Sequence, residues 1–111
     1  MTTIFSRIIK GELPCRKVFE NERVIAFWDI APQAPVHILI VSKKELKSLQ
    51  EAKEKDQLLL GEMLLIATEI AHDLDIQEGY RLLTNIGSDA GQVIHHLHFH
   101  LLGGRVLGHI A

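Results

Sequence analysis

Residues 95–102 read His95-His96-Leu97-His98-Phe99-His100-Leu101-Leu102, and the rest of the chain is interpreted outward from this stretch. Side chains on a β-strand point alternately to its two faces, so a strand here carries His96, His98 and His100 on one face. The other face then presents His95 and the apolar side chains of Leu97, Phe99 and Leu101. The stretch predicts a strand with one apolar face against a core and one row of imidazoles.

A row of imidazoles is typical either of a metal site or of acid–base and nucleophilic chemistry. Two histidines at positions i and i+2 can converge on one zinc ion, whose ligand atoms lie about 2.0 to 2.1 Å from the metal. The third imidazole, roughly 13 Å from the first along an extended strand, cannot easily join them. Catalysis by these histidines is therefore favoured. The alternatives are a mononuclear metal site and histidines that only cover a solvated strand face.

Composition and charge narrow the class of protein. The 111 residues predict one domain over 1–111, and 47% hydrophobic with 23% charged residues is an ordinary globular composition. A net charge of −2 provides no general attraction for nucleic acid or an anionic membrane, so neither partner is expected. The apolar run 58–71 falls short of a membrane span. Cys15, the one cysteine, cannot form an intramolecular disulfide, and no secretory signal pattern is present, so we expect a cytoplasmic protein.

The hydrophobic pattern predicts helices and strands in the order of an α+β domain. Apolar residues at 4, 5, 8 and 9 predict a short helix ended by Gly11. Runs rich in β-branched, aromatic or other apolar residues predict strands over 17–20, 24–29, 36–41, 80–85 and the histidine stretch. Together they predict a five-stranded antiparallel sheet with one long and one or two short helices.

Two helices are expected between the third and fourth strands. The spacing from Ser42 to Glu45 is that of a capping box, which predicts a short helix from Glu45 to about Ala52. Asp56 is a suitable N-cap for a long helix that runs to about Leu74. This helix has two adjacent apolar stripes, wider than one small sheet can bury. A homodimer built on this helix and the fourth strand is therefore expected.

The chain resembles the histidine-triad (HIT) family, and its Hint-like branch of nucleotide-binding phosphoramidases in particular. The resemblance rests on the run from His96 to Leu102, on Gly103-Gly104-Arg105 and on three further runs, Ile4-Phe5, Asp29-Ile30-Ala31-Pro32-Gln33-Ala34-Pro35-Val36-His37 and Asn85-Ile86-Gly87-Ser88-Asp89-Ala90-Gly91-Gln92. It covers nearly the whole chain. It implies the HIT-like fold, with two chains joined into one continuous sheet.

The resemblance also implies roles for the histidines. His98 attacks the α-phosphorus of a substrate, and His100 donates a hydrogen bond to a non-bridging oxygen. His96 supports the orientation of His98, and His37 completes a polar relay behind them. Without the resemblance, a lone histidine at a strand start, such as His37, is more often a hydrogen-bonded structural residue.

Substrate-binding residues are implied in the same way. Asp29 receives the ribose hydroxyls, although an Asp beside a turn more often bonds its own backbone. The loop 87–91 either only connects two strands or binds an anion through its backbone N–H groups. The wall of the nucleoside pocket is expected from Phe5, Ile8, Phe27, Trp28 and Ile30, and contacts to the phosphate or leaving group from Asn85, Gly91, Gln92 and Val93.

The activity that the resemblance implies is hydrolysis of purine nucleoside 5′-phosphoramidates, through a covalent nucleotidyl-histidine and with neither metal nor cofactor. The alternatives are hydrolysis of dinucleoside polyphosphates, and a nucleotide- or zinc-binding module without turnover. One position departs from the family pattern. Relatives of this branch often have serine where this chain has Val93, which puts assistance to the leaving group in doubt.

Overall fold

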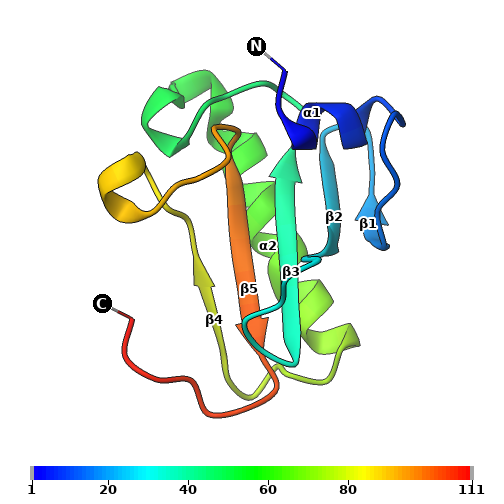
Figure 1. The fold of residues 1–111 in the computed structure, drawn as a ribbon, viewed down its shortest axis with the longest axis vertical. Helices are drawn as coiled ribbons and strands as arrows, with labels where there is room; N and C mark the ends of the chain where they lie inside the picture. Colours follow the sequence, from blue (N-terminus) through cyan, green and yellow to red (C-terminus); the bar gives the residue numbers. More distant parts are fainter. Residues whose placement is uncertain (1, 111) are drawn as a thin grey trace.

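The fold is taken from a computed structural model, and residues 2–110 are described. Its sheet has five strands, β1 (Lys17–Glu20), β2 (Val24–Trp28), β3 (Val36–Ser42), β4 (Tyr80–Leu83) and β5 (His98–Gly103). They pair in the order β1-β2-β3-β5-β4, and every pairing is antiparallel (Figure 1). The predicted α+β class and the five-stranded antiparallel sheet are therefore confirmed.

Both α-helices of the described chain lie where the sequence predicts them. In α1 (Ile4–Ile9), the Thr3 side chain accepts from the Ser6 N–H and the Ser6 hydroxyl accepts from the Thr3 N–H, a reciprocal cap. Gly11 follows α1 with a φ of 79°, which favours glycine. The long helix α2 (Gln57–Asp73) begins one residue after Asp56. Single 3₁₀ turns form η1 (Leu49–Glu51), η2 (Glu54–Asp56) and η3 (Ser88–Ala90).

The predicted helix from Glu45 to Ala52 is wrong. The Ser42 hydroxyl donates to the Lys44 carbonyl at 2.9 Å and does not cap a helix. One 3₁₀ turn, η1, occupies part of this segment instead, with Ser48 as its N-cap. Asp56 precedes α2 as expected, but its carboxylate accepts from Lys44 Nζ and the Lys53 N–H and caps no N–H of α2.

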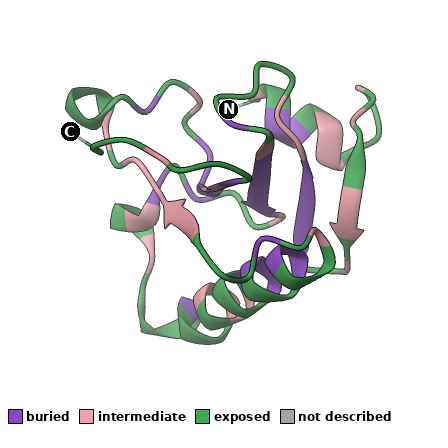
Figure 2. Ribbon diagram, turned by 90° about the horizontal axis from the view of Figure 1, so that it is seen from below, coloured by how far each residue is buried: buried purple, intermediate pink, exposed green. Residues whose placement is uncertain are grey.

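Helix α2 crosses one face of the sheet and α1 lies at the other (Figure 1). Beneath α2, side chains of Met63, Ile66 and Ile70 pack against alternate residues of β2, β3 and β5. Figure 2 shows the buried residues of α2 on the side toward the sheet. A second, smaller cluster on the opposite face is formed by Phe5, Ile25, Phe27, Leu39 and Val41. The sheet thus has two covered faces, and the second one carries the histidines.

Apolar side chains remain on the outer surface of α2. Leu58, Leu64 and Leu65 are 89%, 43% and 65% exposed. Strand β4, at the edge of the sheet, also has one side without a partner strand. Within residues 2–110, no helix combines the length and apolar character that crossing a bilayer requires.

Candidate active site

Strand β5 carries two of the three histidines of the triad stretch. It begins at His98, so His96 lies just before the strand and not within it. Across the β3–β5 pair, Leu39 is opposite His100 and Val41 is opposite His98. These residues point away from α2, as the alternation predicts. His37 of β3 lies on the same face, two residues before Leu39, and is 3% exposed.

A cavity of about 550 Å³ opens in front of these histidines. It combines imidazoles, one carboxylate, apolar side chains and the loop before β5. Its lining residues are Phe5, Asp29, Ala31, Gln33, His37, Leu39, Asn85, Gly91, Gln92, Val93, Ile94, His98 and His100. Nine of the fourteen predicted site residues are in this list: Phe5, Asp29, His37, Asn85, Gly91, Gln92, Val93, His98 and His100.

The imidazole of His98 is fixed in one tautomer by a backbone carbonyl. Its Nδ1 lies 2.6 Å from the His96 carbonyl oxygen, and a carbonyl can only accept, so the proton is on Nδ1. The Nε2 atom then holds the lone pair. Burial lowers the pKa of His98 from its ordinary value, outweighing the opposing effect of the His96 carbonyl. Its ring is therefore neutral at neutral pH. The ring packs against Phe5 in a T-shaped arrangement, with ring centres 4.9 Å apart.

His96 supports the site from behind and does not line the cavity. Its Nε2 lies 2.6 Å from the Ser42 carbonyl oxygen, and the residue is 2% exposed. This bond holds the peptide whose carbonyl fixes His98. His96 therefore contacts His98 through its backbone oxygen, and its supporting role stays a prediction.

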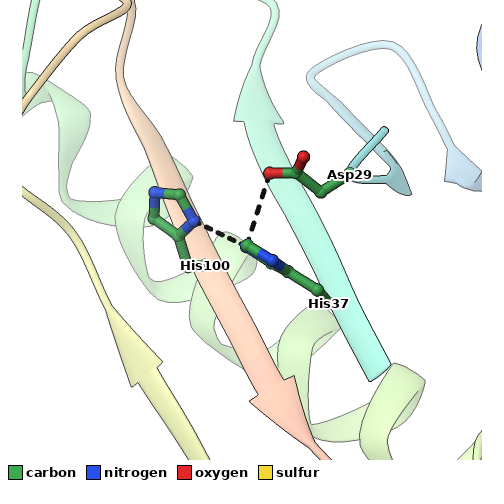
Figure 3. A group of neighbouring side chains, drawn as sticks. All are labelled: Asp29, His37 and His100. Carbon is green, nitrogen blue, oxygen red and sulfur yellow. Dashed lines mark hydrogen bonds and ion pairs between the residues drawn. The ribbon is translucent and has the colours of Figure 1, made fainter. Parts of the chain in front are cut away.

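Asp29, His37 and His100 form a close group at one end of the cavity (Figure 3). The Gln33 N–H donates to His37 Nδ1 at 3.0 Å, which places the proton of neutral His37 on Nε2. That Nε2 is 2.9 Å from His100 Nδ1 and 3.5 Å from the nearer Asp29 oxygen. His37 therefore donates mainly to His100, and the proton of His100 is on Nε2.

Charge and burial keep this pair neutral. The pKa of His100 is lowered to about 4, mainly by burial and to a smaller extent by the neighbouring His98 and His37. Burial also lowers the pKa of His37, against the opposing influence of the Asp29 carboxylate. At neutral pH the group consists of two neutral imidazoles beside one carboxylate.

The same three side chains are the candidates for a metal site. One ligand atom from each of Asp29, His37 and His100 lies within 4.8 Å of the others. To bind a cation, His37 would need its lone pair on Nε2 and its proton on Nδ1. The Gln33 N–H already points at Nδ1, so two hydrogens would then face each other. The donor set fits a hydrogen-bond relay better than a cation.

The Asp29 carboxylate accepts a hydrogen bond within its own turn, which is the alternative role predicted from the sequence. One carboxylate oxygen, Oδ1, accepts from the Ala31 N–H at 2.8 Å. The other, Oδ2, faces His37. A ligand hydroxyl in the cavity therefore has Oδ2 as its nearest free acceptor on this residue.

Four other predicted pocket residues lie outside the lining. Phe27 and Ile8 belong to the apolar cluster behind Phe5, and Ile30 is fully exposed on the β2–β3 turn. The expectation for Trp28 is wrong, because this side chain packs against the core beneath α2, on the opposite face of the sheet. There the Arg16 guanidinium lies 4.8 Å from the centre of its ring. Strand alternation places Phe27 and Trp28 on different faces.

The loop before β5 has the backbone that its glycines predict, with φ of 83° at Gly87 and 89° at Gly91. The expected contact of Gln92 with the phosphate or leaving group is not supported. Its Oε1 accepts from the Gly87 N–H, and its Nε2 donates to the carbonyls of Lys47 and Ile94. Gln92 therefore stabilises the loop, and Val93, 85% exposed, lies at the rim of the cavity.

Sequence reasoning missed Gln33, which acts through its backbone N–H. A backbone donor leaves no signal in residue type or spacing, since nearly every residue provides one. The only indication is indirect: a histidine at a strand start directly after a proline-containing turn has the N–H groups of that turn within reach.

Comparison with known proteins gives a consistent set of relatives. A family model described as the HIT domain matches residues 10–107. An "Uncharacterized HIT-like protein" of Chlamydia trachomatis is 50% identical over 111 residues, covering 100% of both chains. A crystal structure of a HIT family hydrolase from Legionella pneumophila matches with a TM-score of 0.94 at 41% identity, covering 96% of each chain. A histidine triad nucleotide-binding protein from Candida albicans matches with a TM-score of 0.84 at 32% identity, covering 99% of this chain and 84% of that one.

Proposed function

The chain belongs to the HIT domain family, and from this premise we propose that it hydrolyses purine nucleoside 5′-phosphoramidates, compounds in which AMP or GMP is linked to an amine. One observation carries the proposal. The Nδ1–H of His98 is bonded to the His96 carbonyl, so its Nε2 lone pair is available in the cavity, next to His100. A neutral imidazole is a competent nucleophile toward phosphorus, whereas a free lysine at neutral pH is almost entirely protonated.

The first step is attack by His98 Nε2 on the α-phosphorus. A P–N bond forms to the histidine, the P–N bond to the amine breaks, and the amine leaves with a proton taken from solvent. Water then attacks the phosphorus of the nucleotidyl-histidine, releases its proton to solvent, and returns the electron pair to Nε2. The products are the nucleoside monophosphate and the free amine, and His98 is neutral again.

The relay from Gln33 to His100 stabilises the charge that develops on phosphate oxygen. The Gln33 N–H sets the tautomer of His37, whose Nε2–H donates to His100 Nδ1. This arrangement leaves the Nε2–H of His100 to donate to a non-bridging oxygen. A donor that is already oriented before the reaction costs no reorganisation as charge develops, and such donors contribute about 2.7 to 4 kcal/mol in other enzymes.

Nucleoside recognition is proposed to use Asp29 and the apolar side chains around the cavity. Asp29 Oδ2 accepts from a ribose hydroxyl, and Phe5 covers the base with Ile8 and Phe27 packed behind it. The exposed Ile30 is close in sequence to Asp29 and is proposed to close over the bound base. Because the Gln92 amide is already bonded to backbone groups of Gly87, Lys47 and Ile94, Asn85 is proposed as the side-chain amide that contacts the phosphate.

A homodimer is proposed as the working form. The unpaired edge of β4 can extend the sheet into that of a second copy, and the partly exposed Leu64 of α2 presents apolar surface. Burying exposed apolar area stabilises such an interface by about 25 cal/mol per Å² before the costs of association.

The activity is tested with a fluorogenic adenosine 5′-phosphoramidate and, in parallel, a dinucleoside polyphosphate. We expect release of the amine and of AMP, with a lower kcat/KM for the polyphosphate. Preferential hydrolysis of the polyphosphate would favour the alternative activity. Tight binding of AMP without turnover of either substrate would indicate that the protein is a nucleotide-binding module and not an enzyme.

A further inference from the structure

The turn between β2 and β3 holds the donor that sets the histidine relay, yet few hydrogen bonds anchor it. Ala34 is buried, but Ile30, Ala31, Pro32, Gln33 and Pro35 are exposed. Its internal bonds join Ala31 to Asp29 and the Gln33 side chain to the Ala31 carbonyl. Such local bonds shape the turn but do not fix it to the sheet. Any hydrogen bond from outside the turn therefore helps to fix the position of the Gln33 N–H.

Arg105, just after β5, provides that anchor. Its Nη2 donates to the Gln33 carbonyl at 2.9 Å, and its Nη1 to the Val106 carbonyl at 3.0 Å. Among the hydrogen bonds of residues 2–110, the bond to Gln33 is the one that joins residues 30–35 to a residue outside 29–37. The end of β5 and the β2–β3 turn meet at the same end of the sheet (Figure 1).

Gly104 brings the arginine into place. Its φ of 94° favours glycine, and a Cβ atom there would lie 2.9 Å from Pro35 Cβ. The segment after β5 is therefore packed closely against the turn, and Arg105 extends from it over Gln33. This contact is independent of the hydrogen bond and places the same two segments together.

We propose that Arg105 is a positioning residue for catalysis, which acts through Gln33 on the tautomers of His37 and His100. The guanidinium holds Gln33 through its carbonyl, and the N–H of the same residue donates to His37 Nδ1. When this anchor is lost, the N–H moves away from His37 and the Nδ1–H tautomer becomes accessible. The Nε2 atom of that tautomer can only accept, so the bond to His100 Nδ1 is lost and the oxygen donor of His100 is no longer oriented.

The kinetic test compares Arg105→Met, which keeps the apolar stem of the side chain, with two other variants. Arg105→Lys restores one donor to the Gln33 carbonyl. Arg81→Met is the matched control, since half-buried Arg81 also donates from Nη2 to a backbone carbonyl, that of Gly108, but not to a residue of the β2–β3 turn. We expect Arg105→Met to lower kcat about two- to twelvefold, the range set by one neutral hydrogen bond, with KM nearly unchanged. Arg105→Lys regains most of the loss, and Arg81→Met has no effect.

The direct test is long-range ¹H–¹⁵N NMR of the imidazoles in the protein without ligand, which distinguishes Nδ1–H from Nε2–H. We expect His37 in the Nε2–H form in the native protein, in Arg105→Lys and in Arg81→Met, and a mixture in Arg105→Met. An unchanged His37 spectrum in Arg105→Met would overturn the inference, even if kcat fell. Equal kinetic losses in Arg105→Met and Arg81→Met would also overturn it.

The kinetic arm rests on the proposed function, whereas the NMR arm does not. If the native protein cleaves no phosphoramidate but the His37 tautomer still changes in Arg105→Met, the proposed function fails and the positioning role stands. If the native protein is active and the tautomer does not respond, the positioning role fails alone.

Discussion

Substituting Val93 by serine tests whether the rim of the cavity faces the leaving group. The side chain lines the cavity that holds His98 and His100, but it can neither donate nor accept a hydrogen bond. A serine hydroxyl there can donate to the departing nitrogen. A neutral hydrogen bond is worth about 0.5 to 1.5 kcal/mol, or roughly a two- to twelvefold change in rate. Because position 93 is 85% exposed, water competes for the hydroxyl, and we expect the lower part of that range, about two- to fivefold.

The assay measures kcat/KM for an alkylamine phosphoramidate and for an aryl phosphate ester of adenosine, whose leaving group needs no help. Val93→Ser should raise the first value and leave the second nearly unchanged. Val93→Ala is the control, since it shortens the side chain without adding a hydroxyl. Equal gains on both substrates, or no gain on either, would show that position 93 does not face the leaving group.

Four further predictions follow from the charges and surfaces of the protein. Burial lowers the pKa of His98, and that of His100 to about 4, so kcat/KM should stay flat as the pH falls below about 6.5; an inflection at or above 6.5 would contradict this. As the pH falls, these histidines bind protons in the unfolded chain before they do so in the folded protein. The free energy of unfolding, measured by chemical denaturation, should therefore fall from about pH 6.5 toward pH 4, and a rise would contradict this prediction. Dialysis against EDTA should leave the activity unchanged, and a loss that zinc restores would favour a metal at Asp29, His37 and His100. Leu64→Glu should dissociate the dimer in sedimentation at micromolar concentration, whereas Leu65→Glu, beside Phe19, should not; a stable folded monomer of the native chain would refute the dimer.

The fold was largely accessible from the sequence because its elements have strong local patterns. Alternation in the histidine stretch correctly separated Leu97 and Leu101, beneath α2, from His98 and His100. The predicted helix at Glu45 failed for a physical reason. A capping-box spacing marks a possible helix start, but this segment lacks the apolar face that would hold a helix against the sheet, and only Leu46 and Ser48 within it are buried.

The site was less accessible, because hydrogen-bond partners depend on the fold. Nothing in the residue type of Gln92 shows that its amide is already bonded to Gly87, Lys47 and Ile94. Trp28 could have been placed correctly, since strand alternation puts it opposite Phe27. The tautomers of His98 and His37 depend on backbone groups, which no side-chain pattern records.

The central claim is that His98 forms a covalent bond to the nucleotide, and mass spectrometry tests it most directly. Protein mixed for a short time with adenosine 5′-phosphoramidate is quenched and digested under conditions that preserve phosphorus–nitrogen bonds. The account predicts an adenylyl group on the peptide that contains His98, located on that residue by fragmentation. It also predicts no adduct and no turnover in His98→Ala, which should still bind AMP. An adduct on His96 or His100, or full turnover by His98→Ala, would contradict the account.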